Sequence, residues 1–248
     1  MTREEIVSMA KYVQFPYVNE TYKDIYDSRE VTRIPLASGY DPLYSRTAND
    51  KHHYTTRYHM EHVLPILNSV FGFGYDRSDF DLVKHVVDEG DYTHLSPKKK
   101  MKFDLYLYDR KEGEDITRAV DFDDLHGSEL YGRSAAHRYW GLYRYAHRCS
   151  RILNRNQPLT GRKLFISGDS QIVPDIPVLA CYFREVWYFD NRTGYVTGPR
   201  DEKGNYSISW DKDKHIRCER FYRAKNFTDV LIQLYTSGLE RYEKWNIY

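Results

Sequence analysis

Apolar residues in this chain gather in short runs separated by polar segments, and four of the runs have the character of strands. They cover residues 103–108 (FDLYLY), 163–167 (KLFIS), 185–189 (EVWYF) and 229–235 (DVLIQLY). The last three runs are mostly apolar or aromatic throughout, which is typical of strands covered on both faces of a sheet. The pattern therefore favours a buried, largely parallel sheet.

Three further segments have helical patterns and lie between these runs. Residues 56–71 place apolar side chains on one side, with Thr56 as the capping residue and Pro65 as the site of a bend. Residues 133–153 form a long, aromatic-rich segment, and residues 176–183 (IPVLACYF) are apolar enough for a buried helix. Strands and helices in this order predict an α/β protein with three layers, α/β/α, around a central, mostly parallel sheet.

A polar turn, Gly168-Asp169-Ser170, connects the strand over 163–167 to the helix over 176–183. Ligands of parallel sheets gather at the carboxyl ends of the strands, which is where this serine lies. A serine at the start of a helix also has free backbone N–H groups beside it, so it can act as a nucleophile next to an oxyanion site. The alternative is that Asp169 or Ser170 only caps the helix.

Composition narrows the classes of function. The chain has 248 residues with 37 Lys and Arg against 36 Asp and Glu, a balance that argues against nucleic acid as a partner. Its three cysteines are widely spaced, which argues against a disulfide framework or a structural zinc site. With no signal peptide and no apolar run near the roughly 18 residues of a spanning helix, we expect a cytoplasmic chain without membrane insertion. The 24 tyrosines suit sugar binding as well as core edges.

A serine nucleophile needs a base, and the densest group of histidines lies in the segment RTANDKHHYTTRYHMEH, residues 46–62. Asp50 and His52 have the Asp-x-His spacing that puts a carboxylate and an imidazole on one edge of an extended segment, and His53 is adjacent. A carboxylate in this position orients the imidazole and stabilises its protonated form. We therefore expect His52 or His53 to be the base that removes the proton of Ser170, and Asp50 to be the acid that orients it.

Two alternatives to this assignment remain open. His59 and His62 are three residues apart on a predicted helix and share a face, so they are candidate metal ligands, although the spacing matches no strong zinc signature. The other alternative is His215, which follows Asp211 and Asp213 in a charged segment. That histidine ranks second because it precedes the strand over 229–235, whereas a late acid–histidine pair normally follows the last strand.

Three blocks of the sequence together resemble a known family. LYSRTANDKHHYTT resembles the Asp-His-His-Trp-Thr block of the DHHW proteins and the related alginate O-acetyltransferase group. LFISGDSQIVPDIPVLACYFREVWYFDNR resembles their serine block, and KNFTDVLIQLYTSG resembles their final strand. The similarity covers residues 43–71 and 163–239, so we expect one domain over 1–248 in which 72–162 contains a long insert between the two blocks.

The resemblance implies an SGNH-hydrolase-like fold and a Ser-His-Asp triad in which Asp and His precede Ser. It also implies acetyl transfer to polysaccharide hydroxyls, in some members with esterase activity. Carried over, Ser170 is the nucleophile and His53 the base. Lys51 then stands where the family has its acid, and Asp50 is one position early. Either the turn brings Asp50 in, or the pair is Asp50 with His52, or the site is degenerate.

The sequence thus predicts a carbohydrate O-acetyltransferase or acetyl esterase that works through an acyl-enzyme. Gly168 and Asp169 flank the nucleophile, and Tyr131 and Trp140 are candidates for aromatic walls that bind the sugar. No tightly bound cofactor is expected, and acetyl-CoA and an acetylated carrier are both open as acyl donors. The alternative function is a catalytically inactive SGNH-like protein that binds carbohydrate or serves in structure or assembly.

Overall fold

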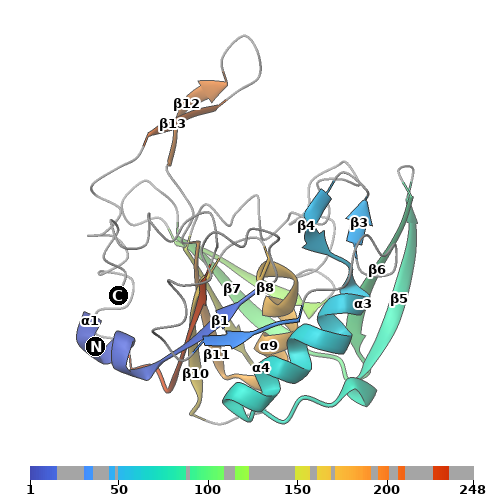
Figure 1. The fold of residues 1–248 in the computed structure, drawn as a ribbon, viewed down its shortest axis with the longest axis horizontal. Helices are drawn as coiled ribbons and strands as arrows, with labels where there is room; N and C mark the ends of the chain where they lie inside the picture. The colour runs from blue at the N-terminus through green and yellow to red at the C-terminus, as the bar shows by residue number, and fades with distance from the viewer. Residues whose placement is uncertain are drawn as a thin grey trace.

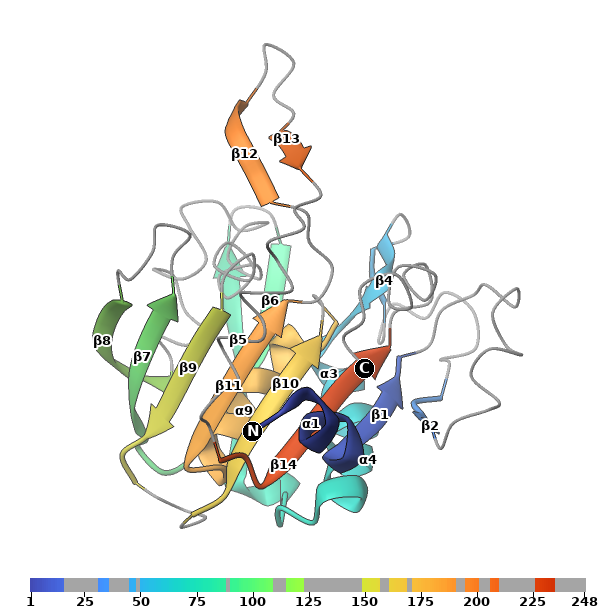
Figure 2. The same cartoon turned by 90° about the vertical axis from the view of Figure 1, so that its left-hand side faces the viewer.

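A computed structural model describes a large part of the chain: residues 1–15, 31–35, 45–47, 50–87, 90–108, 115–122, 149–156, 161–168, 171–190, 195–200, 206–209 and 226–234. At its centre lies an eight-stranded sheet with the order β2-β1-β14-β10-β11-β9-β7-β8 (Figure 2). The strands in that order are Val31–Arg33, Ala10–Gln14, Asp229–Leu234, Lys163–Gly168, Glu185–Asp190, Cys149–Asn154, Lys102–Tyr108 and Asp115–Asp121.

The sheet is mostly parallel. All neighbours from β2 to β11 pair in parallel, and β9, β7 and β8 are added to that block in antiparallel fashion. The four strands expected from the apolar runs are confirmed as β7, β10, β11 and β14. Three further pairs of strands lie outside this sheet: β3 with β4 (Ser45–Thr47, Asp50–Tyr54), β5 with β6 (Phe80–Val87, Gly90–Pro97) and β12 with β13 (Tyr195–Arg200, Tyr206–Ser209).

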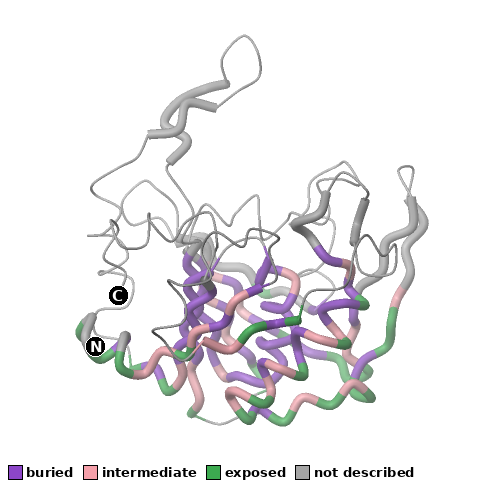
Figure 3. Tube along the Cα trace, in the orientation of Figure 1, coloured by how far each residue is buried: buried purple, intermediate pink, exposed green. Residues whose placement is uncertain are grey.

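Alternate residues of the central strands bury themselves on opposite faces of the sheet, as the two-residue period of a strand requires. Leu164 and Ile166 of β10 belong to the larger core, which contains the helix α9 (Ile176–Tyr182). Phe165, between them, belongs to a smaller core on the side of α1 (Arg3–Met9). Figure 1 shows α9 and α1 on the two sides of the sheet, and Figure 3 shows the buried residues gathered in these central layers. The predicted α/β class is confirmed.

The helical segment expected over 56–71 is present but consists of three pieces. These are α3 (Thr56–Tyr58), a π-helical turn η2 (His59–Val63) and α4 (Leu64–Phe71). In the π turn the Leu64 N–H donates to the His59 carbonyl, five residues back. The irregular turn comes directly before Pro65, whose missing N–H prevents the regular bond of an α-helix at that point.

The capping residue of this segment is Thr55 and not Thr56, so that prediction was wrong. Thr55 has an extended backbone, with φ −72° and ψ 161°, and its hydroxyl accepts from the Tyr58 N–H at 3.4 Å. Thr56 is already helical and its side chain is buried. An N-cap residue must keep a non-helical backbone in order to turn its side chain back to the first free N–H groups, and only Thr55 meets that condition.

The helix expected over 133–153 was wrong for its last part, because residues Cys149–Asn154 form strand β9; residues 133–148 lie outside the described part of the chain. In β9 the side chains of Ser150, Ile152 and Asn154 are buried in alternation. The strand is hydrogen-bonded to β7 on one side and to β11 on the other. Pairing on both edges outweighs a local helical preference, which amounts to only tenths of a kcal/mol per residue.

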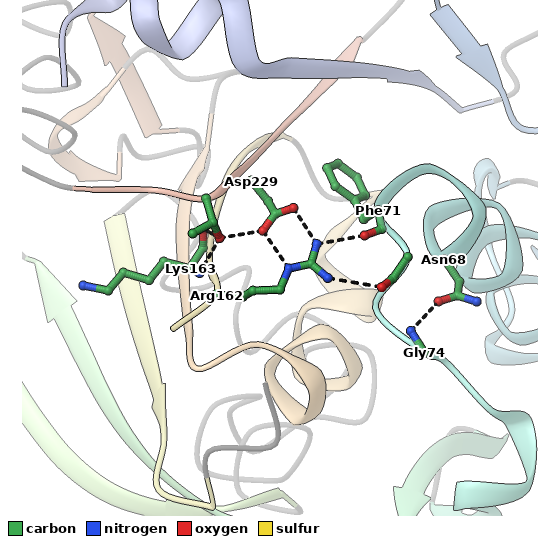
Figure 4. A network of polar contacts seen from close by, with 8 residues as sticks. Asn68, Phe71, Gly74, Arg162, Lys163 and Asp229 are labelled. Atoms are coloured by element: carbon green, nitrogen blue, oxygen red, sulfur yellow. Dashed lines mark hydrogen bonds and ion pairs between the residues drawn. The ribbon is translucent and has the colours of Figure 1, made fainter. Parts of the chain in front are cut away.

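Arg162 joins the beginnings of two central strands to the end of α4 (Figure 4). Its guanidinium group binds the Asp229 carboxylate at 2.6 and 3.1 Å and donates to the carbonyls of Phe71 and Gly72 at 2.8 and 3.2 Å. Carbonyls at a helix end lack hydrogen-bond donors within the helix, and the Arg162 guanidinium group provides donors for two of them. The helical segment that follows β4 is therefore tied to β10 and β14. None of the described helices has the length and apolar character that crossing a bilayer requires.

Candidate active site

The strand β10 ends at Gly168, where the chain passes very close to its neighbours. A Cβ atom on Gly168 would lie 2.6 Å from Cγ2 of Ile172 and 2.8 Å from Oε1 of Gln233, so this position has no room for a side chain. Asp169 and Ser170 lie outside the described residues. The chain is described again from Gln171, which is buried. Ser170 is thus two residues beyond a tightly packed strand end.

After this turn come a short 3-10 helix, η4 (Val173–Asp175), and then α9. The N–H of Asp175 donates to the carbonyl of Ile172 at 3.0 Å, so Asp175 is held to the first residues described after Ser170. The predicted helix over 176–183 is confirmed as α9, all of whose residues are buried. The strand β10 and the helix α9 follow one another here as the sequence predicted, and the turn at 169–170 between them stays a prediction.

Asp175 is bonded to His59, which comes from the other sequence block. Nδ1 of His59 lies 2.9 Å from Oδ2 and 3.0 Å from Oδ1 of the carboxylate. When the carboxylate is ionised it only accepts hydrogen bonds, so in that state the Nδ1–H group is the donor that both oxygens share. This is the contact by which a carboxylate orients a histidine in acid–base sites, with Nε2 at the opposite edge of the ring.

The pair lies in the interior of the protein. Asp175 is 0% exposed and His59 is 3% exposed. Burial raises the pKa of the Asp175 carboxyl, and His59 opposes that rise by its charge and its hydrogen bond. An unpaired carboxylate in this position would be costly, so the imidazole is the group that makes a buried acid tolerable here.

Two aromatic rings lie close to the imidazole of His59. The ring of Tyr58 stands at 89° to it with 6.2 Å between centroids, and the ring of Phe15, just after β1, is tilted at 6.1 Å. Tyr58 is itself fully buried, stacks on Tyr54 at 4.1 Å and donates its hydroxyl hydrogen to the carbonyl of Pro35. Burial raises the pKa of the Tyr58 hydroxyl. The apolar surroundings strengthen the contact between the imidazole and the carboxylate.

The histidines expected to act on Ser170 lie on β4, whose backbone the structure describes without the side chains of Asp50, His52 and His53. Figure 1 and Figure 2 both place β4 toward the end of the molecule at which β10 and β14 finish. From β4 the chain passes directly through Thr55 into α3 and the π turn. The roles of these side chains remain predictions.

Several predicted site residues lie outside the described part of the chain, and their roles also remain predictions. They are Ser170, Asp169, Tyr131, Trp140, Asp211, Asp213 and His215. Gly168 is the one predicted substrate-site residue that the structure describes, as the buried last residue of β10. Its close packing leaves no room for a larger residue at the end of β10.

The two histidines considered as metal ligands both lie close to the ring of Tyr58, but their other contacts differ. His59 binds Asp175, whereas the ring of His62 lies against Tyr58 with 5.0 Å between centroids. In the part of the chain that the structure describes, no group of three or more His, Cys, Asp or Glu side chains is arranged to hold a metal ion. The surroundings of His59 are those of a histidine paired with an acid.

Sequence reasoning missed Asp175, although the sequence contains a sign of it. It is an acidic residue within the otherwise apolar stretch IVPDIPVLACYF, where a carboxyl is bound to be buried. A buried acid requires a partner, and a histidine or a basic residue in another block is the natural candidate. Gln233 is a similar case, because it is a buried amide in the apolar strand DVLIQLY.

Comparison with known proteins gives the fold. No family model matches the chain, and no curated sequence is significantly similar to it. A DHHW family protein from Eubacterium siraeum DSM 15702 superposes with a TM-score of 0.55 at 16% identity, over 93% of this chain and 79% of that one. Bacillus cereus PatB1 superposes with a TM-score of 0.54 at 15% identity, over 96% and 86% of the two chains.

The structure of Bacillus cereus PatB1 with a sulfonyl adduct gives a TM-score of 0.55 at 16% identity, over 96% of this chain and 85% of that one. At these identities the likeness concerns the fold. The chain has a mixed α/β fold that is consistent with the SGNH-like type and similar to those of a DHHW family protein and PatB1.

Proposed function

We propose that this chain is a serine acyltransferase or esterase that acts on acetyl groups of a carbohydrate, with Ser170 as the nucleophile. The observation that carries the proposal is the tightly packed end of β10 at Gly168, in a fold similar to that of a DHHW family protein. Ser170 follows Gly168 by two residues, and sheets of this type bind their ligands at the carboxyl ends of their parallel strands, which supports the assignment.

In the proposed reaction, His53, or His52, removes the proton of the Ser170 hydroxyl while Asp50 orients the imidazole. The serine oxygen bonds to the acyl carbonyl carbon, and the backbone N–H of Ser170 stabilises the oxyanion. The protonated histidine then gives its proton to the leaving group of the donor, which departs and leaves an acyl-enzyme.

A sugar hydroxyl or water completes the cycle. The histidine takes the proton of this acceptor, whose oxygen attacks the acyl carbonyl, and Ser170 leaves and regains its proton. Transfer to a sugar in preference to water requires a surface that binds the sugar. Tyr131 and Trp140 are the proposed aromatic walls, and acetyl-CoA or an acetylated carrier is the proposed donor.

One observation favours a second candidate, a carbohydrate-binding or assembly protein that has kept the fold without the activity. Lys51 occupies the position of the family's acid, and a cation beside an imidazole disfavours the protonated form that the reaction needs. The two candidates differ in whether Ser170 is nucleophilic.

The test is covalent labelling with phenylmethylsulfonyl fluoride followed by intact mass, together with hydrolysis of an aryl acetate. The choice of reagent follows from the sulfonyl adduct in PatB1. Ser167 provides a matched control, because it lies within β10, three residues before Ser170. Its side chain is buried, and its hydroxyl has no hydrogen-bond partner among the described residues. We expect one adduct per chain that Ser170→Ala abolishes and Ser167→Ala retains. An adduct that survives in Ser170→Ala would end the proposal.

A further inference from the structure

His59 and Asp175 connect the two sequence blocks that the proposed reaction has to bring together. His59 lies six residues after His53, and Asp175 lies five residues after Ser170. Their side chains meet at 2.9 and 3.0 Å, and this contact joins η2 to η4. Any displacement of one block relative to the other must therefore strain or break this contact.

On the histidine side, rigid contacts lead from the pair back to β4. His59 is the first residue of the π turn, and turns of this rare kind occur often at functional sites. The preceding residue, Tyr58, stacks on Tyr54, which is the last residue of β4, and its backbone N–H is bound to the side chain of Thr55. The orientation of the His59 ring is therefore coupled to the end of the strand that carries His52 and His53.

On the serine side, an equally short path leads from Asp175 to the turn. Its N–H is bonded to the carbonyl of Ile172, and the side chain of Ile172 fills the space over Gly168. The position of the Asp175 carboxylate thus constrains both ends of the described chain that flank Ser170. Burial of the whole path leaves little freedom for compensating movements.

The pair is too deeply buried to act on a substrate itself, with exposures of 3% for His59 and 0% for Asp175. We infer that His59 and Asp175 are positioning residues, a buried pair that sets the distance and angle between the histidines of β4 and Ser170. The inference rests on the proposed function for its catalytic consequence. It also makes a claim that is independent of catalysis: the hydrogen bond between His59 and Asp175 couples the segment that follows β4 to the segment that follows β10.

The first experiment measures that coupling without any activity. Hydrogen exchange is followed in wild type, Asp175→Leu and His59→Leu. We expect Asp175→Leu to speed exchange of the amides in residues 50–58, across the pair, while β7 and β8 keep their protection. His59→Leu should have the converse effect on residues 171–175. Unchanged exchange across the pair in both variants would overturn the inference, whatever the enzyme does.

The second experiment uses turnover of an aryl acetate. Misplacement of a catalytic group by about 1 Å can cost about 10²-fold in rate, so we expect His59→Leu to lower kcat by about that factor with KM nearly unchanged. His59→Asn places an amide N–H close to the position of Nδ1 and should restore most of kcat. The control is His62→Asn, in the same π turn, whose ring lies against Tyr58.

A third variant separates positioning from stability. The double change His59→Leu with Asp175→Leu removes the buried polar groups together, so it should recover the melting temperature. A contact between two leucines does not fix the orientation of the two segments as a hydrogen bond does. We therefore expect kcat of the double variant to stay low. Wild-type kcat in the double variant would overturn the positioning role. If wild type shows neither turnover nor labelling at Ser170, the proposed function fails, and the exchange experiment alone decides on the coupling.

Discussion

Nδ1 of His59 lies 2.9 Å from Oδ2 of Asp175, although 116 residues separate them in the chain. One residue follows the histidine-rich strand β4 and the other follows the serine turn. Both are buried, and neither is part of the acid–histidine pair that the sequence suggested. Within the core, the hydrogen bond joins the π turn η2 to the 3-10 turn η4.

Removal of one partner should be far more damaging than removal of both. Loss of one member of a buried pair typically costs about 3–5 kcal/mol, because the other polar group is left unpaired. We therefore expect His59→Leu to lose stability on that scale and the double change with Asp175→Leu to lose much less. Urea unfolding of the two single variants and the double variant measures the difference. Strictly additive losses would contradict the prediction.

Ser170→Ala should abolish activity while the protein remains folded. Loss of a cap costs about 0.5–2 kcal/mol, whereas loss of a triad serine has cost about 10⁶-fold in rate in a comparable enzyme. Ser167→Ala, in contrast, removes a buried hydroxyl without a described partner and should be neutral or stabilising. Paired melts and turnover of an acetyl ester provide the measurement. Full activity in Ser170→Ala would show that this serine only completes a turn.

Gly168→Ala should disturb the serine turn directly. The added methyl group would meet Ile172 at 2.6 Å and Gln233 at 2.8 Å, and overpacking of this kind costs about 1–3 kcal/mol. We expect a strong loss of turnover together with a moderate loss of stability. Gly161→Ala is the control: at φ 86° it strains the backbone at the other end of β10, with no atom close by. It should lower stability and leave kcat unchanged.

Ionisation of the Tyr75 hydroxyl should lower the free energy of unfolding at high pH. Burial is the main cause that raises the pKa of its hydroxyl from 10.0 to about 12, with Asp175 and Asp76 adding to the rise and Arg77 opposing it. The folded protein thus holds this proton more tightly than the unfolded chain, so the contribution is complete below pH 10 and is lost as the pH rises toward about 12.

Tyr75→Phe should therefore shift alkaline unfolding to higher pH. At neutral pH it should be neutral or stabilising, because the hydroxyl is buried without a partner among the described residues. Circular dichroism between pH 9 and 12 (a window that follows from the two pKa values) measures the midpoint. An unchanged midpoint would mean that other groups control alkaline unfolding.

Much of the sheet could be predicted because each strand is marked by a run of apolar residues in its own sequence. The runs that became β10, β11 and β14 are mostly apolar or aromatic, which is the composition of strands covered on both faces of a sheet. The sequence predicts a helix up to residue 153 because the residues before Cys149 are helical in character, whereas the two strands that pair with β9 are distant in sequence. Local preference is weak compared with two full ladders of hydrogen bonds.

By itself the sequence determined the α/β class, the core strands and the helix that follows β10. Only the tertiary structure decided that His59, one of several histidines in a polar segment, faces Asp175. Periodicity shows which side of an element is buried, but the partner on the other side belongs to another part of the chain. A buried acid needs a donor, and the packing of η2 against η4 decides which donor it meets.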